Sequence, residues 1–175
     1  GTLTIDAVSL ASDLPPQETP ADDDLAAAYD PRYVELDGRR VLVDDEPFFA
    51  IGMYHGDPDG LQGTGFNLTV AGIPDADFLD ACARNGILIT PDLGGVARAH
   101  LPGRAWEAAE PFRGHPAVLG WYVCDEPDHV RWNVPPPEMR LASDSLRSMY
   151  RHHLTWTVVM PWADSNIYQY VDIIA

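Results

Sequence analysis

Two adjacent carboxylates at the end of an apolar segment are the residues of this chain best placed to carry out chemistry. Residues 118–124 have the composition of a buried strand, and Asp125 and Glu126 follow directly, ahead of Pro127. In α/β barrels the active site is built at the C-terminal ends of the strands. A carboxyl group that burial keeps protonated there can donate a proton near neutral pH. The competing interpretation is an ordinary polar turn in which both carboxylates are simply solvated.

The segments that must position these carboxylates alternate between strand and helix from Arg32 onwards. A hairpin over residues 34–43, turning at Asp37-Gly38, comes first. The predicted strands that follow are residues 48–54, 67–72, 87–92, 118–124, 154–160 and 171–175. The predicted helices between them span residues 74–86, 104–110 and 135–149, with a short helical stretch around Ile167. The first of these strands is so continuously apolar that we expect it to be buried on both faces.

Alternation of strand and helix predicts a parallel sheet. Two features favour a (β/α)8 TIM-type barrel over a doubly wound open sheet. No glycine-rich phosphate-binding loop follows the first strand, where residues 54–57 are Tyr-His-Gly-Asp. Polar or aromatic residues also end the strands, namely Tyr54, His55, Asp92, Asp125, Glu126 and Trp162. A barrel has eight strands and about 250 residues. Because residues 32–175 supply at most six strands, we expect an incomplete barrel.

The composition limits the partners of the chain. Its 175 residues include 27 acidic and 11 basic ones, all of the latter arginine, for a formal net charge of −16. Because so acidic a surface repels phosphate groups and anionic lipid, we expect neither nucleic acid nor a membrane as partner. No apolar run approaches the ~20 residues needed to span a bilayer. Cys82 and Cys124 are expected to be buried free thiols and not a disulfide.

The histidines do not suggest a metal site. They occupy positions 55, 100, 115, 129, 152 and 153, and no H-x-H or H-E-x-x-H motif is present. We therefore expect neither a metal nor another cofactor. His152 and His153 are expected to close a helix, where a cationic side chain suits the helix dipole.

The N-terminal residues differ in character from the rest. Residues 1–10 alternate between apolar and polar as a strand does, and a single strand must pair with something else. Residues 11–31 are rich in proline and aspartate and poor in large apolar side chains, which is typical of a linker. We therefore expect a strand at 1–10, a linker at 11–31 and the partial barrel at 32–175.

Two of the predicted strands resemble those of clan A glycoside hydrolases. Residues 48–54, Phe-Phe-Ala-Ile-Gly-Met-Tyr, are similar to the first barrel strand of that clan. Residues 119–127, Leu-Gly-Trp-Tyr-Val-Cys-Asp-Glu-Pro, are similar to its fourth strand, which often ends in Asn-Glu-Pro. Residues 1–10 look like the last strand of a carbohydrate-binding β-sandwich. The resemblance implies a secreted or periplasmic multidomain glycosidase, with an oligo- or polysaccharide substrate and with the remainder of the barrel or a β-sandwich domain as partner.

The resemblance also implies roles for the residues at the strand ends. Glu126 corresponds to the general acid/base of a retaining mechanism, and the nucleophile, a glutamate about 5–5.5 Å away on a seventh strand, lies outside this chain. Asp125 stands where the family usually has asparagine. An ionised aspartate only accepts hydrogen bonds and favours a proton on Glu126, although the replacement also suits an altered substrate or lost activity. The residues expected to line the sugar site are Asp125, Asp92, Tyr54, His55 and Trp162.

Several alternatives stay open at this point. Asp92 could cap a turn, His55 could be a hydrogen-bonded structural histidine, and Trp162 could pack at the rim of the barrel. A non-catalytic carbohydrate-binding or scaffolding protein could use the same fold. A metal-dependent barrel hydrolase with Asp92 or Asp125 as ligand is a further alternative.

Overall fold

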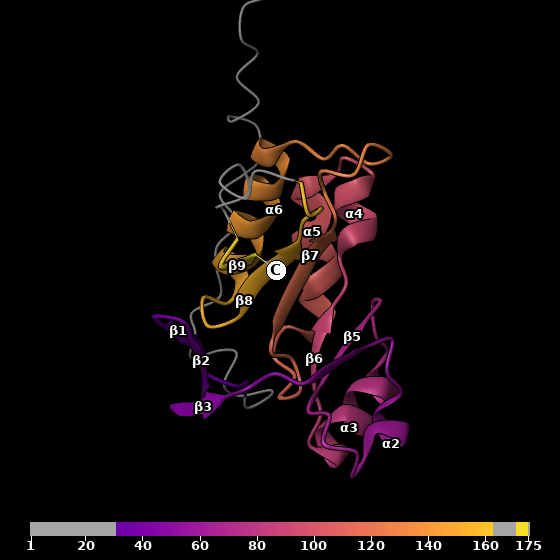
Figure 1. The fold of residues 1–175 in the computed structure, drawn as a ribbon, viewed down its shortest axis with the longest axis vertical. Coiled ribbons are helices and arrows are strands. Elements are labelled where there is room, and N and C mark those ends of the chain that lie inside the picture. The colour runs from indigo at the N-terminus through magenta and orange to yellow at the C-terminus, as the bar shows by residue number, and fades with distance from the viewer. Residues whose placement is uncertain (1–30, 163–170, 175) are drawn as a thin grey trace, which may run out of the picture.

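Six short parallel strands form the centre of the chain, as Figure 1 shows for the computed structural model. The structure describes residues 31–162 and 171–174. The strands are β4 (Gly52–Tyr54), β5 (Leu68–Ala71), β6 (Leu88–Pro91), β7 (Gly120–Asp125), β8 (Leu154–Val158) and β9 (Ile173–Ile174). Strands β4, β5 and β6 pair in that order, and so do β7, β8 and β9. Parallel bridges from Ile89 to Val118 and from Asp92 to Tyr122 join β6 to β7, so the strands make one continuous arc.

This arc confirms the parallel pairing that the strand–helix alternation predicted. Neither the outer edge of β4 nor that of β9 pairs with another strand of the described residues, so the arc is open and this part of the chain contains no closed barrel. The predicted strand at residues 1–10, all but the last residue of the linker at 11–31, and the helical stretch around Ile167 lie outside the described residues.

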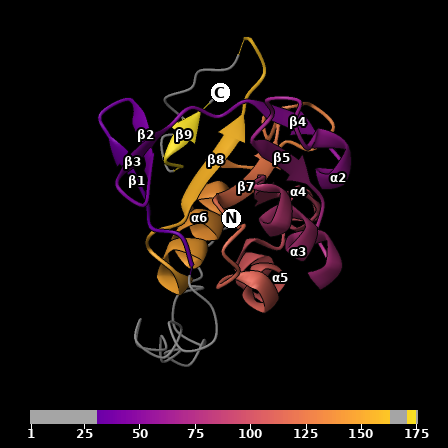
Figure 2. The same ribbon diagram turned by 90° about the horizontal axis from the view of Figure 1, so that it is seen from below.

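Helices follow the outer side of the arc (Figure 2). They are α2 (Pro58–Leu61), α3 (Ala76–Asn85), α4 (Gly94–Arg98), α5 (Ala105–Ala109) and α6 (Pro136–Met149), with 3-10 turns at Pro102–Arg104 and Glu110–Phe112. The larger apolar core lies between helices and strands, where Trp121 of β7 and Leu146 of α6 are fully buried. None of the helices in the described ranges is both long and apolar enough to cross a lipid bilayer.

Helix α3 shows how the sequence sets the limits of an element. The Asp75 side chain accepts a hydrogen bond from the backbone N–H of Phe78 at 2.9 Å and so caps the first turn. Gly86 ends the helix in the left-handed conformation, with φ of 67°. Leu79 and Cys82 form the buried stripe between these two ends.

An antiparallel sheet covers the N-terminal ends of the parallel strands. It consists of β1 (Val34–Asp37), β2 (Arg40–Val43) and β3 (Glu46–Phe48). The predicted hairpin is confirmed, although its turn residues are Gly38 and Arg39, one position later than expected. Val34 packs with Leu68 and Leu119, at the starts of β5 and β7. The opposite, carboxyl ends of the strands are therefore the end left for a binding site.

The prediction of one buried strand over residues 48–54 is wrong. Phe48 ends β3, and β4 begins only at Gly52. Phe49 is 81% exposed and Tyr54 is 50% exposed. The physical reason is the open edge, because β4 has a partner strand on one side only and its apolar side chains have little to pack against in the described residues.

His153 also departs from expectation. The predicted cationic helix end is in fact a fully buried imidazole that follows α6 and precedes β8. Its ring lies edge-on to Trp121 at 5.3 Å and to Tyr150 at 4.6 Å. Neither ring nitrogen has a hydrogen-bond partner within the part of the chain that the structure describes. Burial lowers the pKa of His153 to about 3, with a smaller contribution from His152, so the side chain is neutral at physiological pH.

We expect this neutral histidine to make stability depend on pH. The pKa of His153 is lower in the folded state, at about 3, than in the unfolded chain, at about 6.5, so acid favours unfolding. Going from pH 7.5 to pH 5.0 should therefore remove about 2 kcal/mol of unfolding free energy through this residue alone. Urea denaturation of the wild type and of His153→Phe at both pH values measures the effect. The wild type should lose more stability than the variant, and equal losses would contradict the assignment.

Candidate active site

The carboxyl ends of β4, β6 and β7 bring together two tyrosine–aspartate pairs. The hydroxyl of Tyr54 donates a hydrogen bond to Asp92 Oδ2 at 3.3 Å. The hydroxyl of Tyr122 donates one to Asp125 Oδ1 at 2.5 Å. The rings of Tyr54 and Tyr122 meet edge to face, with centroids 6.4 Å apart. Three of the residues expected at the sugar site, Tyr54, Asp92 and Asp125, thus lie side by side.

Tyr122 is the member of this group that the sequence did not predict. It is only 2% exposed, and its ring stacks on Trp156 at 4.2 Å. In a regular strand, residues 122 and 125 would point to opposite faces. The pairing of β7 with β8 is irregular between Tyr122 and Cys124, and this bulge brings Tyr122 and Asp125 to the same side. A buried tyrosine needs a hydrogen-bond partner, which is the one signal in the sequence that could have indicated its role.

Glu126 directly follows β7 in an unusual backbone conformation. Its φ of 46° lies in the left-handed region, which costs free energy for a residue with a side chain. The neighbouring strand β8 fixes the Glu126 backbone, because the N–H of Glu126 donates a hydrogen bond to the carbonyl of Val158 at 2.9 Å. Among the described residues, no hydrogen bond or ion pair engages the Glu126 carboxylate. Its side chain is half-buried, directly after the carboxyl end of β7.

His55 and Trp162 lie further out than the tyrosine–aspartate pairs. His55 has a left-handed φ of 55°, and its ring meets that of Tyr54 edge-on at 4.3 Å. Trp162 is 76% exposed and follows the segment that the Met160 N–H ties to Asp128, at 3.1 Å. The structure thus places His55 beside the pairs and leaves Trp162 without a ring contact to another described residue. Their roles at the site stay predictions.

Both phenols at the site are hydrogen-bond donors at neutral pH. Burial raises the pKa of Tyr54, and the carboxylates of Asp92 and Asp125 raise it further, while Arg98 lowers it. Burial also raises the pKa of Tyr122, followed by the hydrogen bond to Asp125. Because both phenols keep their protons, each holds its aspartate as an acceptor.

The cysteines are not nucleophiles at this site. Cys82 and Cys124 are buried free thiols, as predicted. Burial raises the pKa of each thiol to about 12, so neither forms the reactive thiolate at neutral pH. Within residues 31–162 and 171–174, no group of three or more His, Cys, Asp and Glu side chains is arranged to hold a metal ion.

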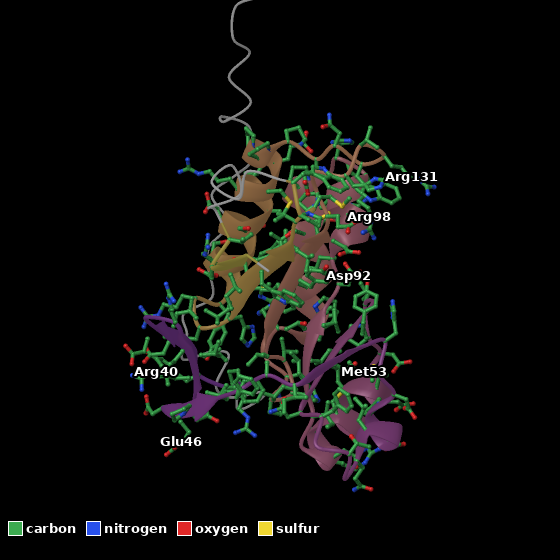
Figure 3. The ribbon with its side chains drawn as sticks, viewed as in Figure 1. Arg40, Glu46, Met53, Asp92, Arg98 and Arg131 are labelled. Carbon is green, nitrogen blue, oxygen red and sulfur yellow. The ribbon has the colours of Figure 1, made fainter. Side chains whose placement is uncertain are left out.

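The first residue of helix α4 fixes the Asp92 side chain. The backbone N–H of Gly94 donates to Asp92 Oδ1 at 2.7 Å. Asp92, Arg98 and Arg131 follow one another along the same side of the molecule in Figure 3. The Arg98 guanidinium also lies over the ring of Trp132, 5.3 Å from its centroid. A Cβ on Gly94 would lie 2.7 Å from Asp92 Oδ1 and 2.8 Å from Arg98 Nη1, so a side chain here requires the ends of these two side chains to shift.

We expect Gly94→Ala to lower the free energy of unfolding by about 1 kcal/mol, at the low end for overpacking, because the new methyl group displaces only the ends of the Asp92 and Arg98 side chains. Gly95→Ala is the matched control in the same helix, since a Cβ there meets no atom within 4 Å. It should be neutral or stabilising by about 0.5 kcal/mol through helix propensity. Urea denaturation of both variants measures the difference, and equal stabilities would contradict the close packing around Asp92.

The fold of the described residues, an arc of parallel strands with helices outside it, is shared by solved structures of glycosidases. A β-glucuronidase from Ruminococcus gnavus in complex with D-glucuronic acid is similar with a TM-score of 0.66 and 15% identity, over 82% of this chain and 30% of that chain. A β-glucuronidase from an uncultured Clostridium sp. gives a TM-score of 0.63 and 14% identity, over 82% and 31%. A glycosyl hydrolase family 2 member from Bacteroides cellulosilyticus DSM 14838 gives 0.63 and 15%, over 82% and 24%.

The sequence identity of these three matches is only 14–15%, so they show a shared fold. The chain spans between about a quarter and a third of the length of the structures it matches, at 24–31%. No protein-family model and no curated protein matches the sequence.

Proposed function

We propose that this chain forms part of a retaining glycoside hydrolase with Glu126 as the general acid/base. The observation that carries the proposal is the Glu126 carboxylate, which has no partner among the described residues and follows β7 in a strained left-handed backbone. Strained residues of this kind are concentrated at functional sites. Glu126 would protonate the glycosidic oxygen and then deprotonate the water that hydrolyses the glycosyl-enzyme. The nucleophile is a second carboxylate about 5–5.5 Å away, on a segment outside this chain.

We propose further that the arc is part of a (β/α)8 barrel. The edges of β4 and β9 are unpaired in the described residues, and additional parallel strands could bind both. A cavity of about 220 Å³ lies against the inner face of the arc, with a lining that is mostly apolar. Thr90 and Trp156 are among the residues that line it. The strands that close the barrel would fill this cavity.

The substrate in this proposal is an oligo- or polysaccharide. Asp92 and Asp125 would accept hydrogen bonds from sugar hydroxyls, beside Tyr54 and His55. The exposed indole of Trp162 offers an apolar face that suits the C–H face of a pyranose ring. We place the protein outside the cytoplasm, in the extracellular space or the periplasm.

Hydrolysis of a panel of 4-nitrophenyl glycosides tests the proposal. The panel includes the glucuronide, because one of the similar structures holds D-glucuronic acid. The protein is the longest natural polypeptide that contains these residues, with residues 1–175 alone beside it. We expect hydrolysis of at least one glycoside with the anomeric configuration retained in the first-formed product, as measured by proton NMR. Inversion would contradict the mechanism.

Asp125 in place of asparagine favours a second candidate, a non-catalytic carbohydrate-binding protein. Sugar binding without any hydrolysis would support it. Loss of activity on chelation would instead support the metal-dependent hydrolase.

A further inference from the structure

Ring contacts and hydrogen bonds fix the position of Tyr122 and the direction of its hydroxyl. Its ring is packed between Trp156, stacked at 4.2 Å, and Tyr54, edge-on at 6.4 Å. Its backbone is fixed too, because its carbonyl accepts a hydrogen bond from the N–H of Leu93 at 2.8 Å. The side chain is 2% exposed, and its hydroxyl donates to Asp125 Oδ1 at 2.5 Å. The Asp125 carboxylate is therefore oriented by a residue that a ligand cannot easily reach.

This hydrogen bond decides what Asp125 can offer to a ligand. An ionised carboxylate has four acceptor positions and no proton to donate. The phenol of Tyr122 occupies one of those positions on Oδ1, and Asp125 is only half-buried, which leaves the other positions for a ligand. An asparagine at this place could have turned its amide N–H groups toward the ligand. Asp125 has no such N–H groups, so its free acceptor positions can pair only with a ligand group that donates a hydrogen bond.

We infer that Tyr122 is a specificity-determining residue, which orients Asp125 to accept a hydrogen bond from one hydroxyl or amino group of the bound sugar. The inference rests on the proposed function, because it takes the carboxyl end of the arc as the sugar site. A sugar with only an acceptor at that position, such as a fluoro, methoxy or carboxylate group, binds poorly. Tyr122 acts on the ligand through Asp125 and does not touch the reacting atoms.

Comparing the wild type with Tyr122→Phe on deoxy sugars tests this inference. The substrates are the aryl glycoside that the wild type hydrolyses fastest and its monodeoxy analogues, each lacking one hydroxyl. We expect Tyr122→Phe to lower kcat/KM for the parent glycoside about 20-fold, as for loss of a hydrogen bond to a charged group. For the one analogue that lacks the hydroxyl accepted by Asp125, the variant should differ little from the wild type. An equal loss on every analogue would make Tyr122 merely structural and would overturn the inference.

Two further variants sharpen the result. Asp125→Asn keeps an acceptor for the Tyr122 hydroxyl and turns amide donors toward the ligand, so it should improve the use of the analogue with fluorine at the recognised position. Tyr33→Phe is the matched control, because it removes a phenol hydroxyl that bonds to Glu35 on the exposed hairpin. This control should leave kcat/KM unchanged on all substrates.

The same variants separate this inference from the proposed function. If the wild type hydrolyses no glycoside, the proposed function fails. Calorimetric titration of wild type and Tyr122→Phe with the free sugars and their deoxy analogues then tests the role of Tyr122 by itself. A selective loss of affinity, absent for one deoxy analogue, supports the inference. Equal affinities of the two proteins for every sugar, or no binding at all, would overturn it.

Discussion

Glu126→Gln is expected to lower kcat about 1,000-fold for glycosides with poor leaving groups, in the range that general acid catalysis contributes. An amide cannot deliver a proton to the departing glycosidic oxygen. The effect should be much smaller for 2,4-dinitrophenyl glycosides, whose leaving group departs without protonation. The measurement is kcat and kcat/KM of wild type and variant across a series of aryl glycosides that differ only in the pKa of the phenol.

A second glutamate of the chain serves as the control for this prediction. Glu46→Gln is the matched control, because Glu46 is an exposed glutamate at the start of β3, labelled in Figure 3 at the opposite end of the molecule from Arg131. Activity unaffected by Glu126→Gln, or lowered equally for every leaving group, would contradict the assignment.

Gly120→Ala is expected to have the largest effect on stability, with a loss of about 3 kcal/mol of unfolding free energy, near the upper end for overpacking. Gly120 begins β7 and lies opposite Leu154 of β8. A Cβ at this position would lie 2.3 Å from the carbonyl oxygen of Leu154, closer than non-bonded carbon and oxygen atoms approach. The backbone of β8 cannot rotate away as a side chain could, so the two strands must separate.

Urea denaturation of wild type and Gly120→Ala, followed by tryptophan fluorescence, measures this loss. Gly72→Ala is the matched control, because Gly72 is exposed just after β5 and a Cβ there meets no atom within 4 Å. It should change the unfolding free energy by no more than about 0.5 kcal/mol. A Gly120→Ala protein as stable as this control would show that β7 and β8 are further apart than described.

Much of the fold follows from local sequence signals. The order of strands and helices is set by the alternation of short apolar runs with amphipathic segments. Helix α3 ends at Gly86, and the hairpin is marked by a glycine with φ of 64° at position 38. Each of these signals depends on residues close together in the chain, which is why they could be predicted.

The features that could not be predicted depend on contacts between residues that are far apart in the sequence. Residues 48–54 look like a buried strand, and whether they are buried depends on what pairs with the outer edge of β4. His153 looks like a helix end, and its neutral state results from burial against Trp121. At the site, Asp92 and Asp125 were predicted from the strand ends, but Tyr122 joined them through a bulge that no local pattern marks.

The order of the arc has a consequence for how the chain reaches its structure during synthesis. Each parallel strand from β5 to β9 pairs with the strand that precedes it in the sequence. Strand β5 can therefore dock as soon as its helix connection has left the ribosome, and β6, β7 and β8 after it. Such nearest-neighbour pairing keeps the contact order low for a parallel sheet, which favours rapid folding. Folding from the N-terminus is the usual course for a growing chain. The strand synthesised last is then always an unpaired edge of the arc, to which a further parallel strand could bind.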